Sequence, residues 1–281
     1  MHVLERAAVT LRRAPLLQRA SLLWRAIRPA YIRLLSAVAE GGLERTINGS
    51  DRMRIVPELY TLPEEYEPDV WRALMREVRQ GDVVADVGAN IGLYTVAISK
   101  RIGPRGRMYA FEPEPTSVGW LRRHVDLNGL QSRVMVYACA VGAYDGSTAF
   151  MGGRGSESHV SVAAAPEPNG TQVPITRLDS VFKDGRLDVL KLDVEGFEEH
   201  VLRGAGELLN DPLRAPRVMF VEVHPYAWAN FGVSSDSFLA LMHDHGYDVA
   251  DLAGNTLHRI RTYGEIVARS RRVAAERPTS A

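Results

Sequence analysis

The chain has 281 residues, and its 34 basic and 34 acidic side chains cancel to a formal net charge of zero at pH 7. This balance provides no overall field that would draw the protein to nucleic acid or to another polyanion. The length suits one well-filled core with an appendage, and the single cysteine, Cys139, excludes an intrachain disulfide and is typical of a reducing cytoplasm. No apolar run approaches the roughly eighteen residues that a membrane span needs.

The N-terminal segment is basic and apolar. Residues 1–36 contain seven arginines, no lysine and only Glu5 as an acid, with leucines at three- and four-residue spacings between them. This pattern predicts amphipathic helices, broken near Pro15 and Pro29, within an extension over residues 1–50. Three roles stay open for it: a helical lid on the main domain, a helix on the surface of a membrane, and an organellar presequence.

Alternating strand and helix patterns fill residues 51–270. We expect strands at 82–87, 107–112, 133–140, 187–193 and 217–223, and helices at 69–78, 91–101, 115–128, 195–209 and 234–245. The alternation predicts an α/β fold with a doubly wound, mostly parallel, Rossmann-like sheet and right-handed crossovers. Such a sheet binds ligands beyond the carboxyl ends of its strands, so the residues that end each strand carry the functional information.

Some stretches depart from this alternation. Residues 52–68 contain three prolines and predict a loop. The stretch 144–177 is Gly- and Ser-rich at 152–156, with short β-like pieces on either side, and predicts a flexible insertion near the mouth of the site. Residues 247–252 and 257–260 flank a turn and predict a hairpin that closes the edge of the sheet. Residues 271–281 predict a flexible tail.

The turn after the first expected strand is the most informative motif. In V-V-A-D-V-G-A-N-I-G-L-Y-T an apolar run ends at Asp86, and Gly88, Asn90 and Gly92 punctuate a turn before an apolar helix. Glycines there let the backbone approach a ligand where a Cβ would collide. The second strand ends at Glu112, which is placed to accept hydrogen bonds from ribose hydroxyls. Together these residues predict a site for an adenosine-containing cofactor.

The cofactor expected at this turn is S-adenosylmethionine. The spacing is G-x-x-x-G, whereas a dinucleotide needs G-x-G-x-x-G and free amides at the helix N-terminus for its pyrophosphate. The carboxylate of Asp86 would repel a phosphate, but it would attract the cationic groups of S-adenosylmethionine. An NAD-type cofactor, and a helix-capping Asp86 beside packing glycines, are the alternatives. After the third strand, the small residues Ala140 and Val141 suit the flank of an adenine ring.

Four ionisable residues end the fourth and fifth strands. Asp193 and Glu195 follow the fourth strand, and Glu222 and His224 end the fifth. Because the carboxyl ends of parallel strands meet at one edge, all four should converge on one rim beside the nucleoside pocket. A structural role as a helix cap or a loop hydrogen bonder is the alternative for each of them.

At these residues the chain resembles a known family. The motifs V-A-D-V-G-A-N-I-G-L-Y-T, Y-A-F-E-P-E-P, A-V-G, T-R-L-D-S, L-K-L-D-V-E-G-F-E and F-V-E-V-H-P occur in this order within about residues 55–265. They resemble the FkbM-type S-adenosylmethionine-dependent methyltransferases. The resemblance implies methyl transfer to oxygen, often to a hydroxyl of a sugar, glycolipid, polyketide or other secondary metabolite. It also implies that the cofactor is bound by Asp86, Gly88, Asn90, Gly92 and Glu112. It implies that the acceptor side is lined by Asp193, Glu195, Glu222 and His224.

The chemistry expected at the rim is removal of a hydroxyl proton during in-line displacement at the sulfonium carbon. His224 is the expected base because an imidazole has an ordinary pKa near 6.5. Glu222 or Asp193 would orient it or take its role, and Glu195 would contact the substrate. A loop histidine bonded to a carboxylate is the structural alternative. A magnesium ion on Asp193, Glu195 and Glu222 is a less favoured alternative, because the spacing of these residues is not dense.

Two other functions stay open: an N-, RNA or protein methyltransferase, and a non-catalytic scaffold that binds the cofactor. The acidic strand tip L-D-V-E-G counts against RNA, because enzymes that act on RNA use a basic groove with stacking aromatics. We therefore expect a small-molecule, glycan or glycolipid acceptor and no nucleic acid. The expected location is the cytoplasm, with a peripheral contact to the inner membrane through the N-terminal segment left open.

Overall fold

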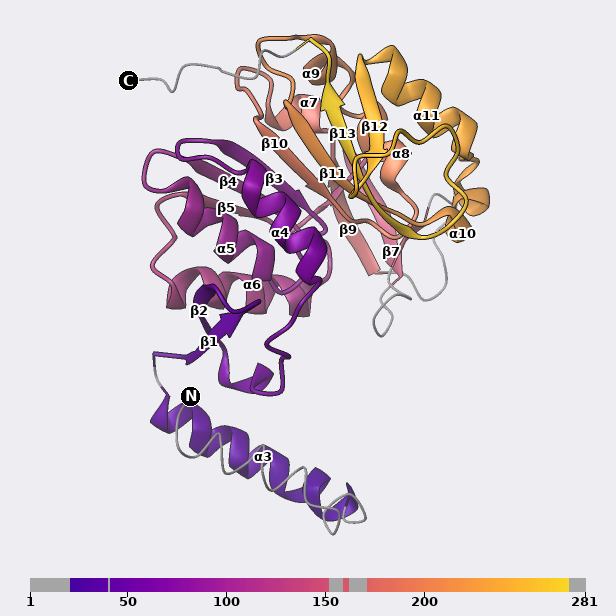
Figure 1. Ribbon diagram of the computed structural model, residues 1–281. Helices are drawn as coiled ribbons and strands as arrows, with labels where there is room; N and C mark the ends of the chain where they lie inside the picture. The colour runs from indigo at the N-terminus through magenta and orange to yellow at the C-terminus, as the bar shows by residue number, and fades with distance from the viewer. Residues whose placement is uncertain (1–20, 40, 152–158, 162–170, 273–281) are drawn as a thin grey trace.

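A seven-stranded sheet forms the centre of the protein (Figure 1), in the order β12-β13-β11-β10-β3-β4-β5. The computed structural model describes residues 21–39, 41–151, 159–161 and 171–272. β13 is antiparallel to both of its neighbours, and the pairs from β11 across to β5 are parallel. The predicted doubly wound, mostly parallel sheet is thus confirmed. Its strands are β3 (Val83–Val87), β4 (Arg107–Phe111), β5 (Val134–Tyr137), β10 (Val189–Leu192), β11 (Val218–Val223), β12 (Tyr247–Asp251) and β13 (Gly264–Ser270).

Helices cover both faces of this sheet (Figure 1). Leu74, Ile98 and Leu121 bury one face, and they belong to α4 (Pro68–Glu77), α5 (Leu93–Ile102) and α6 (Pro115–Leu127). Phe182, Leu202 and Phe238 are buried on the other face, which is covered by α7 (Leu178–Val181), α8 (Glu198–Arg203), α9 (Gly206–Asn210) and α11 (Ser235–Asp244). Strands buried on both faces explain why the central segments read as apolar runs rather than as alternating patterns.

Two expected elements are each divided in the structure. The strand expected at 133–140 becomes β5 and a separate β6 (Ala140–Val141), and the helix expected at 195–209 becomes α8 and α9. The helix breaks at Gly204, where a Cβ would lie 1.9 Å from the carbonyl oxygen of Gly142. The close approach of two segments that are distant in sequence therefore interrupts a helix that periodicity alone extends.

A second sheet has four strands in the order β6-β9-β7-β8. Its remaining strands are β7 (Gly146–Met151), β8 (His159–Ser161) and β9 (Thr171–Thr176). The short β-like pieces expected on either side of residues 152–156 form β7 and β9, which pair with each other. Val173 and Ile175 alternate into the core and hold β9 in place. The Gly- and Ser-rich residues 152–156 lie outside the described residues.

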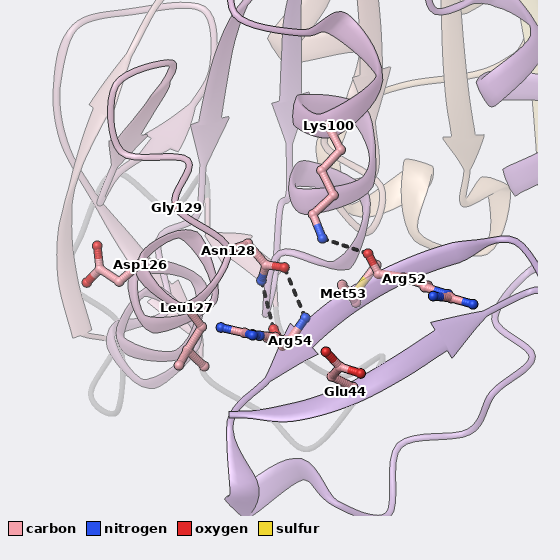
Figure 2. Close-up of a pocket in the computed structure, with 9 residues that line it drawn as sticks. All are labelled: Glu44, Arg52, Met53, Arg54, Lys100, Asp126, Leu127, Asn128 and Gly129. Atoms are coloured by element: carbon pink, nitrogen blue, oxygen red, sulfur yellow. Dashed lines mark hydrogen bonds between the residues drawn. The ribbon is translucent and has the colours of Figure 1, made fainter. Parts of the chain in front are cut away.

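A hairpin of β1 (Leu43–Ile47) and β2 (Asp51–Ile55) packs beside the ends of α5 and α6. Figure 2 shows the contacts, which border a pocket of about 450 Å³. The side chain of Asn128 bonds to the backbone N–H and carbonyl of Arg54, at 2.9 and 2.8 Å, and Lys100 donates to the carbonyl of Arg52 at 2.6 Å. These bonds fix the hairpin on the body of the protein.

The hairpin corrects one prediction and bears on another. The loop expected over 52–68 is wrong at its start, because Met53 and Ile55 alternate inward and make β2 a strand with a buried side. Position 50 falls within the hairpin, between its two strands. The division into an extension over 1–50, a domain over 51–270 and a tail over 271–281 stays a prediction.

Helix α3 (Ser21–Val38) lies at one end of the molecule, near the hairpin (Figure 1). It continues through Pro29, so the break predicted there is wrong, and Pro15 lies outside the described residues. Packing helps the helix to tolerate the proline, since the ring of Tyr31 meets that of Tyr60 edge-on with centroids 5.4 Å apart. Within the described ranges we find no helix with the length and apolarity that a membrane crossing requires.

The C-terminal edge of the sheet differs from the predicted hairpin. The turn forms with an antiparallel bridge between Ala250 and Thr256, and Leu257 donates to the carbonyl of Val249. The pairing does not continue as a strand, and the paired strand beside β12 is β13. Ile260 is buried instead, and its backbone N–H donates to Ser235 at the start of α11. Ile260 is therefore held at the start of α11, and the later apolar strand β13 lies between β11 and β12.

Candidate active site

Two glycines of the turn after β3 are required by close contacts within the protein. Gly88 has a φ of +83°, and a Cβ there would lie 1.8 Å from the backbone oxygen of Asp193. Gly92 has a φ of +88°, and its Cβ would lie 2.4 Å from Leu121 of α6. Both positions therefore need glycine for conformation and for space. The contact of Gly88 brings the turn expected to bind the cofactor directly against Asp193, the residue after β10.

Glu112 follows β4 and holds the same turn from the other side. One carboxylate oxygen accepts from the N–H of Asn90 and the other from that of Glu114, each at 2.8 Å. Burial raises the pKa of Glu112 to about 7, although both amide bonds act to lower it. A carboxylate can accept about four hydrogen bonds, so its oxygens retain capacity for ribose hydroxyls. The ribose contact itself stays a prediction.

Asp86 lies one residue before the end of β3 and is a buried carboxylate, only 1% exposed. Thr95 donates to one of its oxygens at 2.6 Å, and the other oxygen has no hydrogen-bond partner within the part of the chain that the structure describes. Burial raises the pKa of Asp86, and the nearby Lys191 opposes that shift. An unsatisfied buried acceptor favours a cationic donor, so Asp86 fits the ammonium of S-adenosylmethionine and does not fit a phosphate.

Lys191 is a buried cation beside this turn that the sequence reasoning missed. It lies opposite Asp86 in the β3–β10 register, and its ammonium is 3.7 Å from Asp193 and 4.7 Å from the centre of the Tyr94 ring. Burial acts to lower the pKa of Lys191, but Asp193 and Asp86 outweigh it and the pKa is raised. The sequence signal that could have identified Lys191 was a charged residue within the apolar run L-K-L.

His224 lies at the centre of the rim and is only 2% exposed. Its Nδ1 is 2.7 Å from Glu198, and its Nε2 is 3.3 Å from Glu195 and 4.0 Å from Asp193. Burial acts to lower the pKa of His224, but the three carboxylates outweigh it, so the pKa is raised above its ordinary value. The structure therefore brings together three of the four residues expected at the rim.

Glu222 lies beside this group but has a different partner. Its carboxylate accepts from the hydroxyl of Tyr263, and its partner across β11 and β13 is Glu265. Burial, with the negative charge of Asp193 acting in the same direction, raises the pKa of Glu222 to about 7. The ring of Tyr263 is 5.2 Å from that of His224, so the tyrosine links Glu222 to the histidine.

Ala140 and Val141 are both buried in β6, which pairs with β9. Their place beside an adenine ring stays a prediction. The neighbouring Cys139 is also buried, and burial raises the pKa of its thiol to about 11. A thiol of that kind stays protonated at neutral pH, which agrees with an inert residue rather than a nucleophile.

The rim could hold a cation, but not with the ligands expected. One ligand atom from each of Asp193, Glu195 and His224 lies within 4.8 Å of the others, whereas the sequence reasoning placed a magnesium ion on Glu222 instead of the histidine. The 3.3 Å between His224 Nε2 and Glu195 is the distance of an ion pair with a protonated imidazole. Such a pair forms when the imidazole is protonated on both nitrogens, and magnesium stays an untested alternative.

Residues that the sequence reasoning left without a role complete the site. The carboxylate of Glu198 lies within hydrogen-bond distance of Nδ1 of His224. Glu198 is the last residue of the motif L-D-V-E-G-F-E. Tyr226 donates to Glu195 at 3.1 Å, and its ring lies 5.8 Å from that of His224. Glu198 could have been found from its motif, whereas nothing in the sequence predicts that Tyr226 and Tyr263 lie next to one imidazole.

The fold and site together define the class of protein. The sheet is mostly parallel with β13 reversed, a glycine turn follows β3, and an acid lies at the tip of β4. This is the arrangement of class I S-adenosylmethionine-dependent methyltransferases. Residues 86–249 match the family model described as the methyltransferase FkbM domain. The chain belongs to the FkbM methyltransferase family, as its motifs predicted.

Individual relatives align with parts of the chain. Methyltransferase 1 of Beauveria bassiana is 30% identical over 144 residues, which are 43% of this chain and 57% of that protein. Methyltransferase sdnD of Sordaria araneosa is 30% identical over 199 residues, 59% of this chain and 73% of that protein. The hexuronic acid methyltransferase AglP of Haloferax volcanii is 27% identical over 165 residues, 56% of this chain and 62% of that protein. The chain thus spans less than two thirds of the first and third of these relatives.

Proposed function

We propose that this protein transfers the methyl group of S-adenosylmethionine to a hydroxyl of a sugar, glycolipid or natural product. The observation that carries the proposal is the buried imidazole of His224 among carboxylates, on a rim whose Asp193 touches Gly88 of the cofactor turn. This contact puts a proton acceptor next to the place where an electrophilic methyl group would be held. The cofactor residues in the proposal are Asp86, Gly88, Asn90, Gly92, Glu112, Ala140 and Val141.

The proposed catalytic residues are His224, Asp193 and Glu222. When bound, S-adenosylmethionine supplies a methyl carbon on a sulfonium, whose C–S bond breaks as the O–C bond forms. Nε2 of His224 takes the proton of the acceptor hydroxyl, Asp193 and Glu222 stabilise the resulting imidazolium, and Glu195 accepts a hydrogen bond from the acceptor. The imidazole is active only when Nε2 is unprotonated, so transfer should increase with pH through the raised pKa of His224.

The charge of the rim supports a neutral acceptor. Asp193, Glu195 and Glu222 gather there, and Lys191 is buried beside Asp193. An anionic acceptor would be repelled, which disfavours RNA. AglP is named for a hexuronic acid, which supports a sugar as acceptor, but the acidic rim favours a sugar without its own carboxylate. N-methylation and protein methylation are the remaining enzymatic alternatives, and a non-catalytic scaffold is the other.

We also propose a peripheral membrane contact through α3 from a cytoplasmic location. Ile27 and Leu34 are 46% and 55% exposed, and Ala30 and Ala37 continue the same helical stripe. α3 contains arginines and no acidic residue, and Arg33 is exposed next to the stripe. An exposed apolar stripe with basic neighbours matches helices that lie in the surface of an anionic membrane. An adjacent side of α3 packs on the protein through Tyr31 and the buried Leu35, which also agrees with a lid.

The test of the main proposal is transfer of label from methyl-labelled S-adenosylmethionine to a panel of methyl glycosides, uronic acids and amino sugars. His224→Ala should reduce transfer by about 10²–10⁴-fold, the usual contribution of a general base, with cofactor affinity unchanged. Activity that survives within about tenfold would assign the base elsewhere. Cofactor binding without transfer to any acceptor would favour the scaffold. Loss of activity with EDTA that magnesium restores would favour a metal-assisted reaction.

A further inference from the structure

The carboxylate of Glu198 is the most completely bonded acid near the rim. It lies at the start of α8 and is 0% exposed. One oxygen meets the N–H of Gly196 at 2.8 Å and Nδ1 of His224 at 2.7 Å, and the other accepts from the indole N–H of Trp228 at 2.7 Å. A buried carboxylate with three polar contacts is well determined in position and cannot reorient without leaving a donor unsatisfied.

These contacts decide which nitrogen of His224 carries a proton. The Gly196 amide and the Trp228 indole can only donate, and they engage both oxygens of Glu198. Glu198 therefore acts as an acceptor on each side, and the donor in its contact with His224 is Nδ1–H. In the neutral imidazole the other nitrogen, Nε2, is then the acceptor, and it points toward Glu195 and Asp193.

We infer that Glu198 is the positioning residue that sets the tautomer of His224, so that Nδ1 holds a proton and Nε2 is left to accept one from the acceptor hydroxyl. The role of Nε2 rests on the proposed function, but the tautomer does not. Glu198 touches no reacting atom in this arrangement. It acts through the histidine by fixing the ring and by stabilising the imidazolium that forms.

The backbone around Glu198 supports a fixed dyad. The chain turns sharply before α8, with a φ of +50° at Glu195 and +99° at Gly196. A Cβ on Gly196 would lie 2.6 Å from that of Ala227, in α10 (Pro225–Trp228), the short helix that begins directly after His224. The turn that carries Glu198 and the helix that follows His224 are thus in direct contact. A positive φ at a residue other than glycine is uncommon and indicates a constrained turn.

Each element around the imidazole contributes a group that could affect its titration. Asp193 and Glu195 face Nε2 from the turn after β10, and Glu198 faces Nδ1 from α8. Tyr226 of α10 and Tyr263, which precedes β13, flank the ring. Glu198 is the group in this set that contacts Nδ1, so its replacement is the change that should alter the tautomer.

The experiment is nitrogen NMR of the full chain labelled with ¹⁵N-histidine, comparing wild type with Glu198→Gln over a pH titration. The wild-type His224 should show the Nδ1–H tautomer at high pH. The substitution removes a negative charge within hydrogen-bond distance, so the pKa of His224 should fall by about one unit or more, with a mixture of tautomers. His124, which is buried and bonded through Nδ1 to the carbonyl of Ile91, is an internal control that should not change.

Trp228→Phe is the matched control variant. It removes the other side-chain donor to Glu198 and leaves the carboxylate next to Nδ1, so the tautomer of His224 should persist. A wild-type Nε2–H tautomer, or a Glu198→Gln titration equal to that of wild type, would overturn the inference. If Glu198→Gln does not fold, the wild-type tautomer and the Glu198→Asp variant, which keeps the charge, decide the question. If the NMR result is as expected but the His224→Ala enzyme is active, the role of His224 as the base is refuted and the tautomer assignment stands.

Discussion

Replacing Gly88 by alanine tests the contact that joins the glycine turn after β3 to the proposed catalytic rim. The added Cβ would lie 1.8 Å from the backbone oxygen of Asp193, where real Cβ contacts are essentially never under 3.0 Å. The positive φ of 83° adds about 1–2 kcal/mol for any residue with a Cβ, and relief of the overlap adds about 1–3 kcal/mol. We therefore expect Gly88→Ala to lower the free energy of unfolding by about 2–5 kcal/mol.

The chain offers a matched control at Gly129, which has a φ of +64° and no atom within 4 Å of an added Cβ. Gly129→Ala should show the conformational cost alone, about 1–2 kcal/mol, and should bind S-adenosylmethionine normally. Urea unfolding followed by tryptophan fluorescence measures the stability of both variants, and calorimetry measures cofactor affinity. Gly88→Ala should lose affinity as well as stability, because Asp193 must move. Equal unfolding free energies for the two variants would refute the reasoning, since the overlap would then have no energetic effect.

Three further predictions concern the buried acids and the exposed apolar residues of α3. Asp86→Ala should reduce S-adenosylmethionine affinity at least about tenfold in calorimetry, because a hydrogen bond to a charged group contributes about 1.5–3 kcal/mol, and unchanged binding would contradict the assignment. Burial raises the pKa of Glu112 to about 7 and that of Glu265 to about 8, so their neutral forms stabilise the fold at low pH and this contribution is lost as pH rises through those values. The free energy of unfolding should fall between about pH 5 and pH 8, and Glu112→Gln should reduce the slope, whereas an unchanged slope would be evidence against the shift. The double variant Ile27→Glu, Leu34→Glu should no longer sediment with anionic vesicles. The control Leu213→Glu, at a leucine elsewhere that is 79% exposed, should still sediment. Equal sedimentation of the two variants would exclude the α3 contact.

Local sequence determined the central sheet and the cofactor turn well. The five parallel strands were expected within a few residues of their bounds, because strands buried on both faces are continuous apolar runs and need no distant partner to be recognised. Gly88 and Gly92 were expected to permit close approach of a ligand, and the structure shows that they permit close approach of Asp193 and Leu121. The residue type could be read locally, whereas the neighbouring atom could not.

Contacts between distant segments decided the elements that were wrong. The hairpin β1–β2 was missed because its strands have one exposed side and are held by Asn128, more than seventy residues away. Pro29 predicted a break in a helix that packing keeps continuous, and Gly204 broke a helix that periodicity made continuous. In each case a tertiary contact outweighed a local preference, since such preferences amount to about 1–3 kcal/mol per residue.

The sequence by itself determined the class of fold, the family, and the residues that end the strands at the rim. The rule that parallel strands end at one edge of the sheet predicted that three side chains would lie close together, those of Asp193, Glu195 and His224. Only the tertiary structure decided how these groups are paired: Glu198 with Nδ1, Glu195 and Asp193 near Nε2, and Glu222 with Tyr263. The physical reason is that a strand order places residues to within a few ångströms, whereas a hydrogen bond depends on side-chain direction, which the packing of α8, α10 and β13 sets.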